Sequence, residues 1–182
     1  TGSTVETLNE SGASQSTVTT TNEFTSAVES APDWIINRVT ETTVTHERTG
    51  QPTISRQSLF DYYGQSDTHA GMLKTETRVL PAENLVTRHC YDNYGNEDKT
   101  LTYSSNVSVS GCSASNSSEL VSNQVFRKVT RVFDAQGRYI TTSHNALMND
   151  VETINGRDRF GQVTQSTGKS GASARAGFDS FG

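Results

Sequence analysis

The histidines and cysteines are the residues of this chain best suited to metal binding or covalent chemistry. The histidines are His46, His69, His89 and His144, and the cysteines are Cys90 and Cys112. No two histidines have the spacing that places both on one face of a helix, as in a helical zinc site. A zinc site would have to combine His89, Cys90 and Cys112, although adjacent residues of a strand point to opposite faces. The pattern favours histidines that are polar or partly buried strand residues.

The two cysteines suggest a covalent link of another kind. Cys90 and Cys112 lie on either side of a predicted strand, residues 100–110, so they would face each other across a hairpin. In a secreted protein they would form a disulfide that stabilises the fold by about 3 kcal/mol. The alternative is two free, buried thiols, and the sequence leaves both open.

Acidic residues offer calcium binding and acid–base catalysis. The acidic segment 92–98 has Tyr94 and Glu97 at its third and sixth positions, which does not fit the order of an EF-hand loop. A weak calcium site stays open as an alternative. A pairing of Asp158 and Asp179 as general acid and base is a further alternative, but turns explain both residues. The sequence contains none of the common nucleophile, phosphate-loop or dinucleotide motifs, so we expect no enzymatic activity and no cofactor.

A short pattern recurs along the chain: an aromatic residue, Asp, two variable residues, Gly and a polar residue. The aspartate–glycine pairs are Asp61/Gly64, Asp92/Gly95, Asp134/Gly137, Asp158/Gly161 and Asp179/Gly182. The aromatic residues are Phe60, Tyr91, Phe133 and Phe178, and Arg157 replaces the aromatic in the fourth copy. A degenerate copy spans residues 46–51.

Turn geometry explains why aspartate and glycine are needed at this spacing. An aspartate that opens a type I turn accepts the backbone N–H two residues further on. The glycine three residues after it takes a positive φ at little steric cost. This turn with a left-handed residue is a common link between hairpin strands. Each copy therefore predicts a hairpin tip, with its aromatic residue packed on the sheet.

The composition also favours strands. The chain of 182 residues has 15 Val against 8 Leu, and Ser (23) and Thr (26) together number 49. The only helical candidate, residues 22–30, is short. Predicted strands span residues 35–45, 53–60, 72–80, 84–91, 100–110, 124–133, 138–143, 151–155 and 162–166. We predict an all-β fold in which successive antiparallel β-hairpins form a curved, open repeat sheet.

Charge and hydropathy exclude some functions and suggest an organisation. The formal net charge of −5 argues against a nucleic-acid partner, and no apolar run is long enough for a membrane span. Residues 1–33 are rich in Ser and Thr, which favours a linker or poorly ordered segment, with polar edge strands as the alternative. Residues 34–182 form the predicted repeat region. The chain starts at Thr1 and ends inside a repeat, so we expect it to be a fragment of a larger protein.

The repeat resembles a known family. Segment 91–96, Tyr-Asp-Asn-Tyr-Gly-Asn, resembles the signature of the RHS, or YD-repeat, proteins. Segments 34–40, 144–147 and 157–164 extend the resemblance over roughly residues 34–182. It implies a ribbon of hairpins that spirals into a large shell, as in bacterial insecticidal toxin complexes, polymorphic toxins and teneurins. Such repeats enclose or display other domains and perform no chemistry.

The resemblance also implies partners and a location. The partners would be the remainder of the parent chain and other toxin-complex subunits, and the protein would be secreted or lie at a bacterial cell surface. A second hypothesis is an extracellular module that binds a glycan or a receptor. Its surface would be formed by aromatic residues near the hairpin tips, namely Tyr62, Tyr63, Tyr94 and Phe160.

Overall fold

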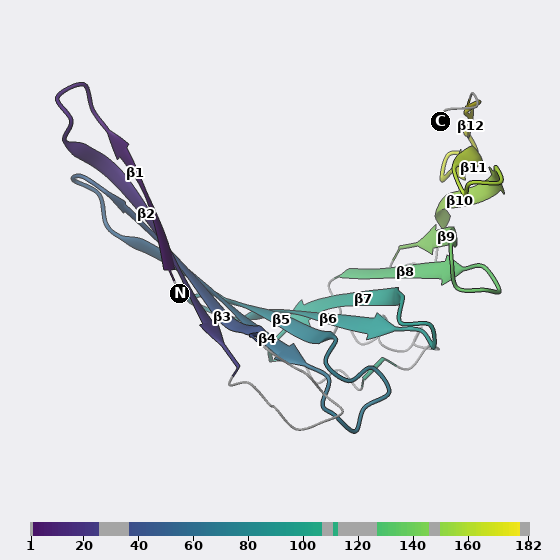
Figure 1. Ribbon diagram of the computed structural model, residues 1–182, viewed down its shortest axis with the longest axis horizontal. Coiled ribbons are helices and arrows are strands. Elements are labelled where there is room, and N and C mark those ends of the chain that lie inside the picture. Colours follow the sequence, from purple (N-terminus) through teal and green to yellow (C-terminus); the bar gives the residue numbers. More distant parts are fainter. Residues whose placement is uncertain (1, 26–36, 107–110, 113–126, 146–149, 179–182) are drawn as a thin grey trace. The chain divides into compact units, whose positions relative to one another are not determined.

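The fold consists of β-strands joined by turns. A computed structural model describes residues 2–25, 37–106, 111–112, 127–145 and 150–178. Within these ranges there are 12 strands and no helix, and each strand pairs with the next one along the chain in a single open antiparallel sheet (Figure 1). The predicted all-β class with successive antiparallel hairpins is confirmed.

The strands are β1 (Gly2–Leu8), β2 (Ser14–Phe24), β3 (Val39–Arg48), β4 (Ile54–Tyr62), β5 (Leu73–Val79), β6 (Leu85–Tyr91), β7 (Glu97–Ser104), β8 (Arg127–Phe133), β9 (Ile140–His144), β10 (Asp150–Arg157), β11 (Val163–Gly168) and β12 (Ser173–Arg175). Nine of them, β3 to β11, correspond to the predicted segments, whereas β1, β2 and β12 were not predicted. The described part of the chain contains no helix that is long and apolar enough to cross a membrane.

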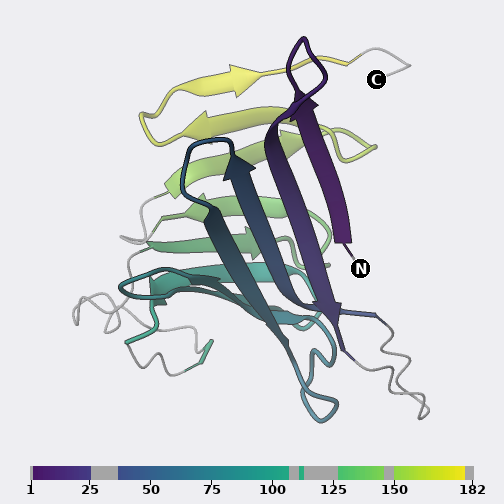
Figure 2. The same ribbon diagram turned by 90° about the vertical axis from the view of Figure 1, so that its left-hand side faces the viewer.

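The chain divides into two compact units. The N-terminal unit comprises Thr1–Arg88 with Ser104–Asn106, and the C-terminal unit comprises His89–Tyr103 with Val107–Gly182. Figure 2 shows the long, dark strands β1 to β4 of the first unit side by side, and the green to yellow strands β8 to β12 of the second. The predicted boundary after residue 33 falls in a segment outside the described residues and stays a prediction.

The linker interpretation of residues 1–33 is wrong for the segments that form β1 and β2. β1 pairs with β2 from Gly2↔Thr21 to Leu8↔Ser14, and β2 continues the sheet to β3. Threonine is branched at Cβ and suits a pleated strand even where little apolar surface is available. All of β1 is exposed and it lies at the edge of the sheet, as in the alternative of polar edge strands, whereas β2 is paired on both sides. Residues 22–24 of the helical candidate end β2.

The hydrophobic core is small and lies in the C-terminal unit. Its buried apolar residues are Cys90 in β6 with Leu101 and Tyr103 in β7, which are 1%, 1% and 6% exposed. Lys99 is also buried, at 4% exposed. Among the described residues the buried apolar set is therefore small, and hydrogen bonds in the sheet and the turns add to its contribution.

Candidate functional site

Three of the predicted Asp-x-x-Gly turns form hairpin tips in the C-terminal unit. They connect β6 to β7, β8 to β9 and β10 to β11. In each turn the glycine N–H donates to the carbonyl oxygen of the aspartate, at 3.0 Å for Gly95, 2.9 Å for Gly137 and 3.1 Å for Gly161. These glycines have φ of 84°, 66° and 84°, a conformation that a side chain disfavours.

The aspartate side chains complete the turns from inside. Asp92 Oδ1 accepts the backbone N–H of Tyr94 at 2.8 Å and that of Asn96 at 2.9 Å. Asp158 Oδ1 accepts the equivalent two N–H groups, both at 2.9 Å. Asp134 Oδ1 accepts the Arg138 N–H at 2.6 Å. These carboxylates are therefore committed to the backbone of their own turns.

The hydrogen bonds change the acidity of two of these groups. Burial raises the pKa of Asp92, but hydrogen bonds from the side chain and backbone of Asn96 outweigh it and leave the pKa below its usual value. The backbone N–H of Arg138 is the main cause of the lowered pKa of Asp134. Both turns thus favour the ionised carboxylate, because an N–H donor stabilises the negative charge.

Neighbouring turns also bind one another. The Tyr94 ring lies so close to Gly137 that a Cβ at this position would overlap it. The Tyr94 hydroxyl donates to the Ala135 carbonyl at 3.1 Å, and the Asn96 side-chain amide donates to the Gly137 carbonyl at 2.7 Å. The turn after β6 is therefore fixed to the turn after β8.

The turn after β8 is fixed in the same way to the turn after β10. A Cβ on Gly161 would approach the Tyr139 ring to 2.6 Å. Arg157 lies over the same ring, with its guanidinium carbon 4.9 Å from the ring centre, and donates to the Gly161 carbonyl at 2.7 Å and the Ile140 carbonyl at 2.9 Å. Arg157, which replaces the aromatic of the repeat, thus links two turns. We call these three connected turns, residues 92–96, 134–139 and 158–162, the turn ladder.

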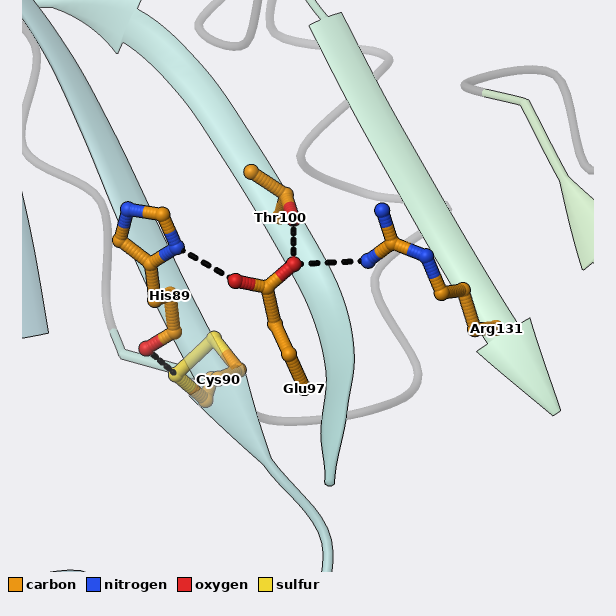
Figure 3. Close-up of polar contacts among 6 residues, drawn as sticks. His89, Cys90, Glu97, Thr100 and Arg131 are labelled. Carbon is orange, nitrogen blue, oxygen red and sulfur yellow. Dashed lines mark hydrogen bonds and ion pairs between the residues drawn. A yellow bond between two sulfur atoms is a disulfide. The ribbon is translucent and has the colours of Figure 1, made fainter. Parts of the chain in front are cut away.

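A second set of contacts crosses the sheet next to the turn ladder. Figure 3 shows Glu97 between His89 and Arg131, which come from β6 and β8. The Glu97 carboxylate contacts His89 Nδ1 at 2.6 Å and the Arg131 guanidinium at 2.7 Å, and it accepts the Thr100 hydroxyl at 2.9 Å. Burial raises the pKa of Glu97, but these three donors outweigh it and lower the pKa. Glu97 therefore ties three consecutive strands together.

The two cysteines are joined. Cys90 and Cys112 form a disulfide with their Cα atoms 5.7 Å apart. The buried Lys99 donates from Nζ to the Cys112 carbonyl at 2.9 Å. The bond ties the chain after β7 back to β6, and both thiols are thereby removed from the hypothetical zinc site.

Asp61 and Gly64 do not form the predicted turn, so this prediction is wrong. Asp61 lies inside β4, paired with Thr75, and its carboxylate is 3.5 Å from Lys74 Nζ. The Gly64 N–H donates to the Asp67 carboxylate at 2.8 Å instead. The loop closes later, where Gly71 takes a φ of 77°. The sequence signal for this longer loop was the wide separation between Asp61 and the next strand, which starts at Leu73.

Three of the four aromatic residues of the repeat lie at strand ends or within strands, and Phe178 follows the last strand. Tyr91 ends β6 and Phe133 ends β8, and both are half-buried. Phe60 is paired with Glu76 inside β4 and is also half-buried. Phe178 is 44% exposed, and the last predicted turn, Asp179 with Gly182, lies outside the described residues.

The sequence analysis missed a turn of the same kind in the N-terminal unit. Asn9 takes the place of aspartate, and its Oδ1 accepts the N–H groups of Ser11 at 3.1 Å and Ala13 at 2.9 Å. The Gly12 N–H donates to the Asn9 carbonyl at 2.9 Å, with a φ of 81° at Gly12. An asparagine oxygen accepts the same hydrogen bonds, so the pattern Asn-x-x-Gly was the available signal.

The four aromatic residues of the predicted ligand surface are divided between the two units. Tyr62 is half-buried beneath Arg38, and its hydroxyl donates to the Val39 carbonyl at 2.7 Å. Burial raises the pKa of Tyr62 despite the opposing charge of Arg38. Tyr63 lies in the same unit, with its ring 6.1 Å from that of His69. Tyr94 and Phe160, in the other unit, are 65% and 64% exposed. Only these last two belong to the turn ladder.

Within the described residues, no group of three or more His, Cys, Asp or Glu side chains is placed to hold a metal ion. His89 and Glu97 bind each other, and the carboxylate of Asp92 binds its own turn.

Comparisons with known proteins found similar solved structures but no matching family. No family model matches the chain, and no curated protein matches it. One similar solved structure is the pore form of the Tc holotoxin of Photorhabdus luminescens with a mutation in TccC3, at 17% identity and a TM-score of 0.48. Another is a crystal structure of TcdB2-TccC3-TEV, at 16% identity and a TM-score of 0.46. In both cases the match covers 94% of this chain but only 8% of the other.

Proposed function

We propose that this chain is a non-catalytic length of wall in an RHS-type shell that encloses or displays toxin or effector domains. The turn ladder is the observation that carries the proposal. It uses the repeated residues themselves to attach each hairpin to the next, as the wall of a repeat protein requires.

The contacts of the ladder are of the nearest-neighbour kind. Tyr94 and Asn96 reach Gly137 and Ala135 of the next turn, and Arg157 binds Gly161 and the neighbouring strand. In repeat proteins, stability is close to a sum of such terms between adjacent units. Each net hydrogen bond contributes about 1 kcal/mol, so a long array gains stability with every added hairpin.

The edges of the sheet support the same role. β1 and β12 are the outer strands, and all of their residues are exposed. Unpaired strand edges readily add further strands. In a parent shell these edges would pair with additional repeats, and we expect the isolated chain to self-associate through them.

The test is to disrupt the turn ladder within the full-length parent protein. Gly137→Val and Gly161→Val together would push the Tyr94 and Tyr139 rings away and separate the three turns of the turn ladder. We expect limited proteolysis, read by mass spectrometry, to cut this segment in the variant and to expose the enclosed part of the parent. Electron microscopy should show a closed shell in the wild type and an opened one in the variant.

The control is Gly64→Ala, because Gly64 has no positive φ and its Cβ would only reach Asp67 at 3.5 Å. This variant should resist protease as the wild type does. The proposal is contradicted if wild-type residues 89–178 are released by protease as an autonomous domain, or if images show them outside any continuous wall.

The second candidate function is binding of a glycan or receptor through the ladder's exposed rings. Phe160 is favoured because its ring is 64% exposed beside the Arg159 guanidinium, 4.6 Å away. A glycan array and a cell-binding assay test this candidate. Binding that is lost on Phe160→Ala and Tyr94→Ala, but kept on Tyr63→Ala, would support it over a purely structural role.

A further inference from the structure

The N-terminal unit places its charges unequally on the two faces of its sheet. The registers align Val18 with His46 and His46 with Ile54, and Val44 with Arg56. Because residues aligned across strands share a face, and residues two apart in one strand do as well, these side chains lie together. We call this the cationic face; its charged and apolar members in β2 to β4 are Val18, Val44, His46, Arg48, Ile54 and Arg56.

The opposite face carries the acids. Glu47 is aligned with Thr17, and Thr17 with Glu6, so all three point away from the cationic face. Glu41 is aligned with Glu23 and also belongs to this opposite face. A protein with a net charge of −5 therefore has one sheet face on which arginines and a histidine are collected with valines and an isoleucine.

The cationic face is hollowed. A groove of about 710 Å³ runs over it, and its lining includes Val18, His46, Arg48, Pro52, Ile54 and Arg56. Thr17 and Glu47, whose side chains belong to the opposite face, contribute to its rim. A second hollow of about 390 Å³ adjoins it and shares His46 and Arg56. Ile54 is 56% exposed at the groove. The two volumes together extend over four strands, β2 to β5, which suits an extended ligand better than a compact one.

Two arginines of the groove form no ion pair with the described carboxylates. Within the described part of the chain, neither Arg48 nor Arg56 lies within ion-pair distance of a carboxylate. Arg78, at the far end of the second hollow, contacts Glu76 at 3.2 Å. Arg48 and Arg56 are thus the groups available to bind an external carboxylate, and a guanidinium binds a carboxylate through two parallel hydrogen bonds.

From these observations we propose that the groove binds an extended peptide in which acidic and aliphatic residues take turns at every second position, so that both kinds of side chain share one face of the peptide. The carboxylates bind Arg48 and Arg56, and the aliphatic side chains lie on Val18 and Ile54. The residues that line the groove include no Phe, Tyr or Trp, so a sugar would have no large ring face on which to stack. The site is distinct from the ring surface of the turn ladder, which belongs to the C-terminal unit.

The test is fluorescence anisotropy of the whole chain with a fluorescein-labelled decapeptide of the repeat Glu-Ser-Val-Ser, which places glutamate and valine on one face of an extended chain. We expect saturable binding that weakens about a hundredfold in Arg48→Gln/Arg56→Gln, about tenfold for each of the two charge-assisted contacts that are lost. Binding should also weaken with added salt, since the charges are exposed. The same peptide with lysine in place of glutamate should not bind.

The matched control is Arg127→Gln/Arg175→Gln, which removes the same charge from exposed arginines of the other unit. Circular dichroism establishes that both double variants remain folded. The proposal is overturned if the two variants weaken binding equally, or if the peptide with serine in place of valine binds as tightly. It is also overturned if heparin binds more tightly than the peptide and depends on Arg48 and Arg56, because the ligand would then be a sulfated glycan.

Discussion

Two turns with the same local geometry have different surroundings in the two units. Asn9 to Gly12 in the N-terminal unit and Asp134 to Gly137 in the C-terminal unit both end in a glycine of positive φ, 81° and 66°. Around Gly12 there is open space, whereas Gly137 is covered by the Tyr94 ring. The residues of a turn are therefore sufficient to reverse the chain, but a ladder needs an aromatic side chain from the neighbouring turn.

The difference indicates where stability is concentrated. The C-terminal unit adds the turn ladder, the Glu97 contacts and the disulfide to its backbone pairing. In the N-terminal unit, threonine and serine are the most frequent residues of the long strands β1 to β4, and none of the described residues of these four strands is fully buried. We expect the C-terminal unit to be the more sensitive of the two to single substitutions.

Gly137→Ala should have the largest effect of the substitutions compared here. Its cost combines a strained φ, about 1–3 kcal/mol, with displacement of the Tyr94 ring, about 1–3 kcal/mol. Gly12→Ala is the matched variant and carries only the strain. Denaturant unfolding measures both, and equal losses of stability would show that the ring contact contributes nothing.

Reduction of the disulfide should have the next largest effect. The loop between Cys90 and Cys112 spans 22 residues, and opening it should lower the free energy of unfolding by about 3 kcal/mol. Urea unfolding with and without a reductant measures this. If Cys90→Ala/Cys112→Ala unfolds at the same urea concentration as the oxidised protein, the bond does not stabilise the fold.

Tyr94→Ala and Phe160→Ala compare the same position of two turns. Tyr94 packs on Gly137 and donates to Ala135, so its loss should cost about 1–2 kcal/mol. Phe160 is about equally exposed and lies beside the guanidinium of Arg159, a residue of its own turn, so its loss should change stability by less than about 0.5 kcal/mol. Thermal unfolding distinguishes the two, and the reverse order would contradict the ladder.

Lowering the pH should cause the smallest and most gradual loss of stability. The pKa values of Asp92, Asp134 and Glu97 are lowered in the folded chain, so their contribution is present above the unfolded values of about 4 and is lost as pH falls through the folded ones. Asp92→Asn keeps an oxygen acceptor but cannot titrate. Its stability should fall less between pH 5 and pH 2 than that of the wild type, and identical pH profiles would contradict this assignment.

Local sequence predicted the hairpins because its signals act over a few residues. Asp92 and Asp158 bind N–H groups two and four residues ahead, and such bonds form wherever the chain can turn. The strand segments were found because valine and threonine mark them in short runs. Asp61 shows the limit of this logic, because pairing with Thr75 across the hairpin keeps it in a strand despite the same pattern.

The contacts that build the site join residues far apart in the chain. Glu97 binds Arg131, and Tyr94 binds Ala135, 34 and 41 residues away. The cationic face depends on the register of β2, β3 and β4, since a shift of one residue would send Arg56 to the other side.

The three aspartate turns were thus determined by the sequence itself, because residues within each turn supply the hydrogen bonds that close it. Which turns would stack, whether the cysteines would meet and which face would gather the arginines were decided by the tertiary structure. Those features depend on register and on pairing between distant segments, and no local pattern records either.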